Sequence, residues 1–422
     1  MNTKSLSIDS PDFLQRAARP RRLDRIARRI VLDKLSRLHH GEITLIEAGK
    51  RQVFGRAEAS FPLSVTLTIN SPAFYSDIAF GGSVGAGEAY IQGCWESSDL
   101  VALGRILLRN RDVLDSMDGG AALLTRPLQK AFHWLNRNTR NGSRRNIAAH
   151  YDLGNDFYAL WLDPEMMYSC AWYETSDTPL EKAAVAKLDR ICQRLDLGPG
   201  DRVIEIGTGW GGFAVHAARR YGCHVTTTTI SREQHAWAQR RIEEEGLGDR
   251  ITLLLDDYRD LEGQYDKLVS IEMIEAVGHE YMDTFFRKCS SLLKPDGQML
   301  LQAITIADQR YDQARRHVDF IKRYVFPGGF LPSVTAMTSA LTRVTDLRAV
   351  NVEDIGLHYA WTLRDWRERF FARIDDVRGQ GFSDEFIRLW EFYLTYCESA
   401  FLERAIGDVQ LHAIKPGARP AI

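Results

Sequence analysis

The chain of 422 residues lacks several features that would place it outside the cytoplasm. No apolar run approaches the roughly 20 residues that a membrane-spanning helix needs, and the opening stretch MNTKSLSIDS has no apolar core of the kind that a signal peptide carries. Cysteine is scarce, with six residues and no CxxC pair, which argues against a structural zinc site and against a disulfide framework. We therefore expect a cytoplasmic protein with reduced thiols and no metal site.

A strong overall charge is also missing. The formal net charge is −2, with 45% apolar and 26% charged residues, which is typical of a globular protein of two or three domains with no nucleic-acid partner. Charge is nevertheless concentrated near the start, where nine Lys or Arg residues lie between Arg16 and Arg37. Apolar residues at helical spacing in the same stretch predict a basic amphipathic helix. Such a helix either lies on an anionic membrane surface or packs on its own domain.

The rest of the chain divides into two patterns. Residues 42–78 alternate apolar and polar side chains and predict short strands, and a glycine-rich stretch (81–95) then precedes a helical pattern (99–114). A basic stretch ending in Asn, Gly and Ser places the domain boundary near residues 136–146, giving domains 1–140 and 141–422. From residue 148 onward helix and strand patterns alternate, which predicts an α/β fold with a doubly wound, Rossmann-like sheet.

The first strand of that sheet leads into VIEIGTGWGGFA (203–214), where a buried strand breaks into closely spaced glycines and a helix follows. Glycine permits positive φ and lets a ligand approach the backbone. The spacing lacks the third glycine of the dinucleotide fingerprint, because Trp210 stands between Gly209 and Gly211. The second strand ends in threonines without the acid that binds the ribose of a nicotinamide cofactor, and the third ends in Asp256, Asp257 and Tyr258. These features favour S-adenosylmethionine as the ligand.

Five motifs follow one another in the chain: HYDLGNDFYALWLDPEMMYSCAWYE, IEIGTGWGGFA, TTISREQ, DYRDL and LKPDG. Together they resemble the cyclopropane fatty acid synthase family of methyltransferases, from about residue 42 to about residue 410. The resemblance implies an N-terminal α+β domain that handles lipid and a methyltransferase domain that follows it. It also implies S-adenosylmethionine-binding positions, which are Tyr168, Ser169, Gly207, Thr208, Gly209, Thr229, Gln234, Asp257 and Tyr258.

The resemblance further implies a reaction. In this family a cis double bond of a phospholipid acyl chain attacks the sulfonium methyl group, and a bound bicarbonate ion removes a proton so that a cyclopropane ring closes. The positions that match the bicarbonate site are Cys170, Glu275, Gln302, Ile304 and Tyr359. Cys397 matches a cysteine often regarded as functional, and the group Trp361, Trp366 and Phe370 is expected to line the acyl tunnel or to pack against it.

One position departs from the usual family pattern, because Gln302 stands where a histidine is common. Glutamine can donate a hydrogen bond to bicarbonate but cannot accept its proton. The EMIEAVG and LQAITI segments are more similar in sequence to the branch of the family whose members make methyl-branched lipids. In that branch the cation loses a different proton, and a separate flavin reductase reduces the methylene product. The product therefore stays open between a cyclopropane and a methyl branch.

Two other classes of function fit the sequence less well. A catalytically weak lipid-binding or scaffold protein would keep the cofactor pocket, but the intact glycine loop and Glu275 argue against it. A small-molecule methyltransferase would have little use for the basic helix and the added domain. The expected partners are a membrane surface with unsaturated phospholipids, a second copy of the chain and a flavin reductase, with the protein held peripherally at the inner face of the membrane.

Overall fold

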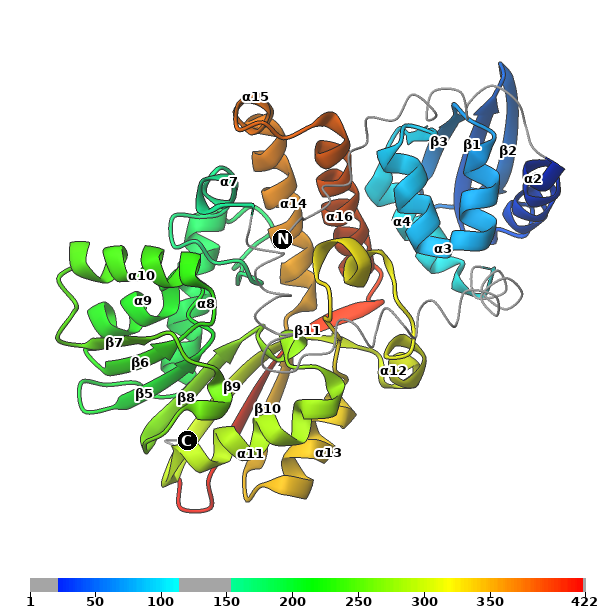
Figure 1. Ribbon diagram of the computed structural model, residues 1–422. Helices are drawn as coiled ribbons and strands as arrows, with labels where there is room; N and C mark the ends of the chain where they lie inside the picture. Colours follow the sequence, from blue (N-terminus) through cyan, green and yellow to red (C-terminus); the bar gives the residue numbers. More distant parts are fainter. Residues whose placement is uncertain (1–21, 114–152, 420–422) are drawn as a thin grey trace, which may run out of the picture. The chain divides into compact units, whose positions relative to one another are not determined.

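The computed structural model describes residues 22–113 and 153–419, which fall into two compact units (Figure 1). The first unit holds residues 22–113 together with residues 383–399, and the second holds residues 153–382 together with residues 400–419. The predicted boundary near residues 136–146 lies outside the described residues.

The first unit is built on a four-stranded sheet in the order β2-β1-β3-β4. Its strands are β1 (Gly41–Glu47), β2 (Lys50–Arg56), β3 (Ser64–Ile69) and β4 (Trp95–Ser97). β1 pairs antiparallel with β2 and parallel with β3, and β3 pairs antiparallel with β4. The mixture of strand directions makes this an α+β unit.

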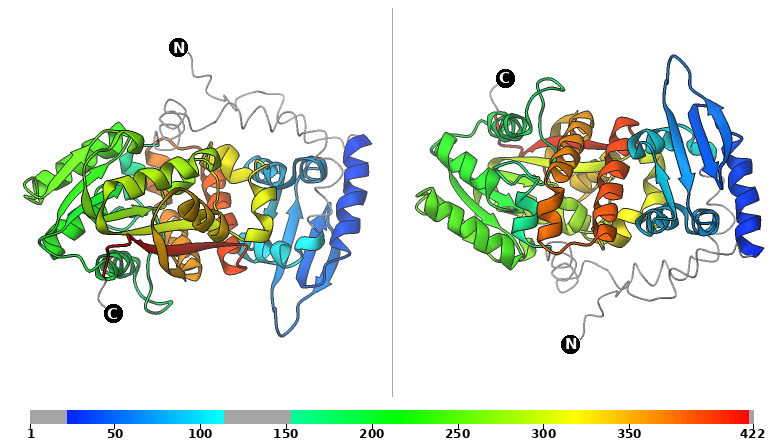
Figure 2. Two further views of the ribbon diagram at one scale, coloured as in Figure 1. Left: turned by 90° about the horizontal axis from the view of Figure 1, so that it is seen from below. Right: turned by 90° about the horizontal axis from the view of Figure 1, so that it is seen from above.

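Three helices accompany this sheet, α2 (Arg22–Leu35), α3 (Ala73–Ile91) and α4 (Leu100–Arg109), and Figure 2 shows α2, in blue, running beside the strands. The prediction of strands as far as residue 78 is wrong for residues 73–78, which open α3. Pro72 stands at the N-cap of α3, where the absence of an N–H group costs nothing. The glycine-rich stretch continues this helix through a kink at Gly82, whose φ of 56° and ψ of −137° are not helical.

Helix α16 (Asp384–Leu402) belongs to the first unit through residues 383–399, although it comes late in the sequence. Arg388 donates from Nε to the carbonyl oxygen of Tyr90 at 2.7 Å, and the Tyr90 hydroxyl donates to Glu391 Oε2 at 2.6 Å. The rings of Tyr90 and Phe392 lie 5.8 Å apart. These contacts explain why a C-terminal helix completes an N-terminal unit.

The second unit contains a seven-stranded sheet in the order β10-β11-β9-β8-β5-β6-β7. The strands are β5 (Arg202–Ile206), β6 (His224–Thr228), β7 (Ile251–Leu254), β8 (Tyr265–Ile271), β9 (Leu293–Ile306), β10 (Arg348–Asp354) and β11 (Ile406–Ile414). The five strands β5 to β9 are parallel, whereas β11 pairs antiparallel with β9 and with β10. The predicted α/β sheet is confirmed, and β10 and β11 extend it beyond the prediction.

Alternation along the strands builds a core on each face of this sheet. On β5, Val203 belongs to the cluster beneath α8 (Leu180–Arg194), α9 (Gly212–Tyr221) and α10 (Arg232–Glu244). Its neighbour Ile204 belongs to the opposite cluster, beneath α11 (Met282–Leu292) and α13 (Val334–Val344). A strand that is covered on both faces is apolar at successive positions, which is why the β5 sequence reads as a continuous apolar run with one acid. Figure 1 shows the two helix layers.

Shorter elements and one long helix complete the second unit. The short helices are α7 (Asn155–Ala159), α12 (Asp308–Ala314), α15 (Ile374–Gly379), the 3₁₀ turns η1 (Tyr258–Asp260), η2 (Ile274–Ala276) and η3 (His279–Tyr281), and the π-helical turn η4 (Ile321–Val325). The long helix is α14 (Gly356–Ala372). Together with the carboxyl ends of β5, β8 and β9, this helix supplies the residues of the candidate site.

Candidate active site

The glycine loop after β5 has the backbone that its sequence predicts. Gly207, Gly209 and Gly211 have φ values of 105°, 54° and 88°, a region that side chains disfavour. A Cβ atom added to Gly209 would meet no atom within 4 Å, so the space beside this residue is open. A Cβ on Gly212 would lie 2.6 Å from the Glu165 carbonyl oxygen, so this glycine allows close packing at the start of α9. An open, glycine-lined turn between a strand and a helix fits the S-adenosylmethionine that the sequence predicts.

Threonines at the end of β6 surround this loop. Thr228 accepts hydrogen bonds at its carbonyl oxygen from the N–H groups of Gly207 and Thr208, at 3.1 and 3.0 Å. Thr229 donates from Oγ1 to Gln234 Oε1 at 2.9 Å, and both side chains are buried. The structure therefore places the two residues predicted to hold the ribose hydroxyls side by side.

The two residues expected to contact the adenine, Asp257 and Tyr258, make contacts within the protein. Asp257 is buried, and its carboxylate accepts from Arg259 Nε at 2.8 Å and from Arg259 Nη2 at 2.6 Å. The Tyr258 ring packs edge-on against Phe285 with centroids 5.6 Å apart, and its hydroxyl is buried. Both side chains are thus engaged within the protein.

A buried acid lies beneath the glycine loop. Glu205 Oε2 accepts from Thr227 Oγ1 at 2.6 Å, and this hydroxyl lies 2.7 Å from the hydroxyl of Thr208 in the loop. Burial raises the pKa of Glu205 to about 8, while the hydrogen bond from Thr227 acts in the opposite direction. The acid of the first strand is therefore connected to the loop through two hydroxyl groups.

The segment containing Tyr168, Ser169 and Cys170 lies beside a buried cation. Lys187 of α8 is fully buried and donates from Nζ to Ser169 Oγ at 2.8 Å. Burial lowers the pKa of Lys187, and the charge of Glu272 opposes this shift. The sequence analysis did not single out Lys187.

Glu272, at the end of β8, is the centre of the polar cluster. Its Oε1 accepts from the backbone N–H of Cys170 and from Gln302 Nε2, each at 2.8 Å, and its Oε2 accepts from the Tyr359 hydroxyl at 2.7 Å. Its φ of 48° lies in the left-handed region, which is unfavourable for glutamate. Backbone strain of this kind is concentrated at functional sites.

The donors around Glu272 are the groups that the sequence assigned to bicarbonate. Cys170, Gln302 and Tyr359 all donate to Glu272, and the N–H of Ile304 donates to Glu275 Oε1 at 2.5 Å. A bicarbonate ion would compete for donors already in use and would lie beside buried carboxyl groups, which is unfavourable for a second anion. With their donors engaged in this way, the residues present do not fit a bound bicarbonate.

Two further acids adjoin Glu272. Burial raises the pKa of Glu275 to about 8, and the charge of Glu272 acts in the same direction. Asp408 of β11 accepts from Gln302 Nε2 at 3.1 Å, and burial together with the charges of Glu272 and Glu275 raises its pKa well above the ordinary value. Within the described residues, Glu275 Oε2 and Asp408 Oδ1 have no hydrogen-bond partner. Glu275 and Asp408 therefore favour the protonated, neutral form.

The polar cluster adjoins both the glycine loop and an aromatic group. The side chain of Met273, the residue after Glu272, lies 3.2 Å from the position that a Cβ on Gly207 would take. Tyr359 stacks on Phe401 with centroids 4.5 Å apart and lies 6.0 Å from Trp366. Tyr168 lies 5.2 Å from Trp366. The acid cluster thus lies between the predicted cofactor loop and apolar rings.

The two cysteines of the prediction differ in their placement. Cys170 is fully buried, and burial with the neighbouring carboxylates raises the pKa of its thiol, so its contribution to the cluster is its backbone N–H. Cys397 lies on α16 in the first unit and is partly buried.

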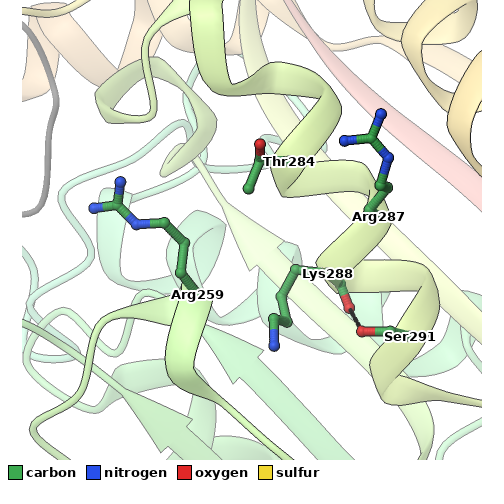
Figure 3. Close-up of a pocket in the computed structure, with 5 residues that line it drawn as sticks. All are labelled: Arg259, Thr284, Arg287, Lys288 and Ser291. Carbon is green, nitrogen blue, oxygen red and sulfur yellow. Dashed lines mark hydrogen bonds between the residues drawn. The ribbon is translucent and has the colours of Figure 1, made fainter.

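A pocket of about 250 Å³ lies on the second unit beside η1 and α11 (Figure 3). Arg259 lines it from η1, and Thr284, Arg287, Lys288 and Ser291 line it from α11. Arg259 is paired with Asp257, and Lys288 donates from Nζ to the Leu261 carbonyl oxygen at 2.9 Å. Because two of its cations already have partners, we do not treat this pocket as the active site.

Comparisons with known proteins identify the family of the chain. A family profile described as mycolic acid cyclopropane synthetase matches residues 138–411. The chain is 38% identical to the tuberculostearic acid methyltransferase UfaA1 of Mycobacterium tuberculosis, over 85% of each chain. It is 37% identical to the cyclopropane-fatty-acyl-phospholipid synthase of Escherichia coli, over 82% of this chain and 86% of the relative.

Solved structures give the same result. The mycolic acid cyclopropane synthase CmaA1, crystallised with S-adenosylhomocysteine (SAH) and CTAB, superposes with a TM-score of 0.60 at 30% identity, covering 64% of this chain and 98% of that one. The cyclopropane synthase MmaA2 from Mycobacterium tuberculosis gives the same values. The chain belongs to the mycolic acid cyclopropane synthetase family and is an S-adenosylmethionine-dependent methyltransferase.

Proposed function

We propose that this enzyme transfers the methyl group of S-adenosylmethionine to the cis double bond of an unsaturated acyl chain in a membrane phospholipid. The observation that carries the proposal is the buried acid cluster, which joins the glycine loop through Met273 and Gly207 and adjoins the rings of Tyr359 and Trp366. An alkene is a poor nucleophile, and the cation that it becomes must be protected from water. A buried proton acceptor among aromatic rings suits that requirement.

The cofactor supplies a methyl group with the character of a cation, and the residues of the chain bind and orient it. The backbone of Gly207 to Gly209 is expected to approach its ribose and methionine portions, with Thr229 and Gln234 holding the ribose hydroxyls. Tyr168 and Ser169 are expected to cover the methionine portion. Orientation of the methyl group against the double bond is the main contribution to rate in a reaction of this kind.

Two products are compatible with this function. Closure of the ring gives a cyclopropane, the product named for the E. coli relative, and loss of another proton gives a methylene group that a separate flavin reductase converts to a methyl branch. Gln302 stands at the place of the usual family histidine, and this difference supports the methylene product as the alternative. The similarity to UfaA1 and to the E. coli synthase is nearly equal, at 38% and 37% identity.

Mass spectrometry distinguishes these outcomes. The purified protein is incubated with S-adenosylmethionine and vesicles of an unsaturated phospholipid, and the acyl chains are analysed before and after mild catalytic hydrogenation. Both products add one CH₂ group, but only the methylene product takes up hydrogen. Acyl chains that gain no CH₂ group would contradict the proposed function.

The membrane surface is proposed as the partner of α2. This helix buries Ala27 and Val31 and exposes Leu23, Ile26 and Ile30, which are 53%, 60% and 40% exposed. Arg22, Arg25 and Arg29 are exposed beside them. Apolar side chains flanked by arginines are suited to the boundary between headgroups and acyl chains of anionic lipid. None of the helices in the described residues is long and apolar enough to cross a membrane.

A further inference from the structure

We propose that the Glu272 carboxylate is the base of this enzyme and takes the place of the bicarbonate ion that the family resemblance implies. The inference rests on the proposed methyl transfer to an alkene and adds the identity of the proton acceptor. It begins from the misfit described above, in which the four donors expected for bicarbonate are used by Glu272 and Glu275.

The geometry around Glu272 favours an ionised carboxylate. Three donors from three parts of the chain point at its two oxygens: the Cys170 N–H, the Gln302 amide on β9 and the Tyr359 hydroxyl on α14. Hydrogen bonds to the charged form of an acid stabilise that form. Burial raises the pKa of Glu272, and these three hydrogen bonds together with the positive charge of Lys187 oppose that rise. The neighbouring Glu275 and Asp408 favour the neutral form, which leaves Glu272 as the acid equipped to hold a negative charge.

The position of Glu272 also connects it to the reacting groups. The residue follows β8 at its carboxyl end, the edge of a parallel sheet where ligands bind. The next residue, Met273, adjoins the glycine loop at Gly207. The backbone holds glutamate here at a φ of 48°, a conformation that glycine would adopt more readily. The strained conformation places a carboxylate among donors that would otherwise be free to bind an anion.

The reaction needs no external base, because Glu272 accepts the proton. Methyl transfer forms a bond from the alkene electron pair and leaves a cation at the other alkene carbon, and the electrons of the broken C–S bond stay on sulfur. Glu272 then removes a proton from the substrate. The electron pair of that C–H bond closes the cyclopropane ring or forms a C=C double bond. The proton remains on Glu272 until it passes to solvent after product release.

The test compares variants in buffer stripped of carbon dioxide, with and without added bicarbonate. The wild-type enzyme is expected to be equally active in both. Glu272→Gln keeps an amide oxygen as acceptor but cannot take a proton, so product formation should fall about 10²–10⁴-fold. Its affinity for S-adenosylmethionine, measured by calorimetry, should stay within a few-fold of wild type, because this residue lies outside the predicted cofactor contacts.

A second variant removes the carboxylate and leaves its three donors in place. Glu272→Gly relieves the backbone strain and exposes the Cys170, Gln302 and Tyr359 donors to an added anion. We expect it to be nearly inactive without bicarbonate and to regain activity as bicarbonate is titrated in, whereas Glu272→Gln should not respond. Glu262→Gln, which removes an exposed carboxylate of the same unit, is the matched control and should retain full activity.

The outcomes separate this inference from the proposed function. A wild-type enzyme that requires bicarbonate, or a fully active Glu272→Gln, would overturn the inference while leaving methyl transfer in place. A wild-type enzyme that binds S-adenosylmethionine but modifies no unsaturated acyl chain, with or without bicarbonate, would overturn the proposed function itself.

Discussion

At the scale of single residues, Gly209 tests the cofactor loop. Its φ is 54° and the space beside it is open, so a valine there would extend into the path of the ligand. We expect Gly209→Val to abolish binding of S-adenosylmethionine in calorimetry. Gly246→Val is the matched control, because Gly246 has a φ of 64° and open space but lies at the end of α10. Equal loss in both variants would mean that strain, and not the ligand path, causes the effect.

Lys187 tests the electrostatics of the acid cluster. Its positive charge lowers the pKa of Glu272, against the stronger effect of burial. Glu272 is faced by Lys187 of α8, Asp408 of β11, Glu275 of η2, Tyr359 of α14 and the Cys170 thiol. We expect Lys187→Met to raise the pKa of Glu272 and so to shift the acid limb of the pH–activity profile upward by about one unit or more.

The control for this prediction is a second buried lysine. Lys267 of β8 donates from Nζ to the Leu195 carbonyl oxygen at 2.5 Å, a hydrogen bond that does not involve the acid cluster. Lys267→Met should weaken folding without moving the profile. An unchanged profile in Lys187→Met, or the same shift in both variants, would show that the Lys187 charge does not act on Glu272.

At the scale of elements, α2 gives a prediction for membrane binding. Replacing Leu23, Ile26 and Ile30 with Ser should weaken binding to anionic vesicles at every salt concentration, because the loss is apolar. Replacing Arg22, Arg25 and Arg29 with Gln should cost about 1 kcal/mol for each arginine at low salt and less at high salt. Binding is measured by vesicle sedimentation.

Arg28 provides the control on the same helix. Its guanidinium is paired with Glu47 at 2.7 Å and lies over the Tyr75 ring, so it holds α2 against its own unit. Arg28→Gln should lower stability more than vesicle affinity. Vesicle binding that depends on Arg28 but not on the exposed arginines would assign the basic helix to packing within the protein.

The elements also show where sequence reasoning reached its limit. Strands β5 to β8 and the apolar second half of β9 were predictable because each is a short run of strand-forming residues between turn signals. Strand β11 was not predicted, although it places Asp408 beside the cluster. Its pairing with β9 joins Gln410 to Gln302, 108 residues apart, and no local pattern specifies so distant a partner. An acid within the apolar alternation of IGDVQLHAI was the available signal.

At the scale of the whole molecule, the site brings together residues that are distant in the sequence, so only part of it could be predicted. Sequence motifs identified Cys170, Gln302 and Tyr359, and the structure brings these three together. They did not identify Glu272, because the resemblance to the family matched Glu275, three residues later, to the acid of the site. The position directly after a parallel strand was the physical signal for Glu272.

The buried acids also make a prediction about folding. The pKa values of Glu205 and Glu275 rise from 4.5 to about 8, so the folded state binds protons that the unfolded state has released over this range. Stability must therefore fall as pH rises through it, by up to about 1.4 kcal/mol per pH unit for each acid. Buried histidines oppose this at lower pH, since the pKa of His412 falls to about 4.

The window from pH 7 to 8 favours the acids, because histidines of the unfolded state, with an ordinary pKa of about 6.5, are mostly neutral there and the folded ones have lowered pKa values. In the absence of S-adenosylmethionine, the free energy of unfolding from urea titrations should decrease across this window. Glu205→Gln keeps an acceptor for Thr227 but binds no proton, so it should be more stable than wild type at pH 8 and should reduce the slope by one acid. Glu262→Gln should leave the slope unchanged, since its side chain is exposed. A wild-type stability that rises from pH 7 to 8 would show that the buried acids are already ionised in the folded protein.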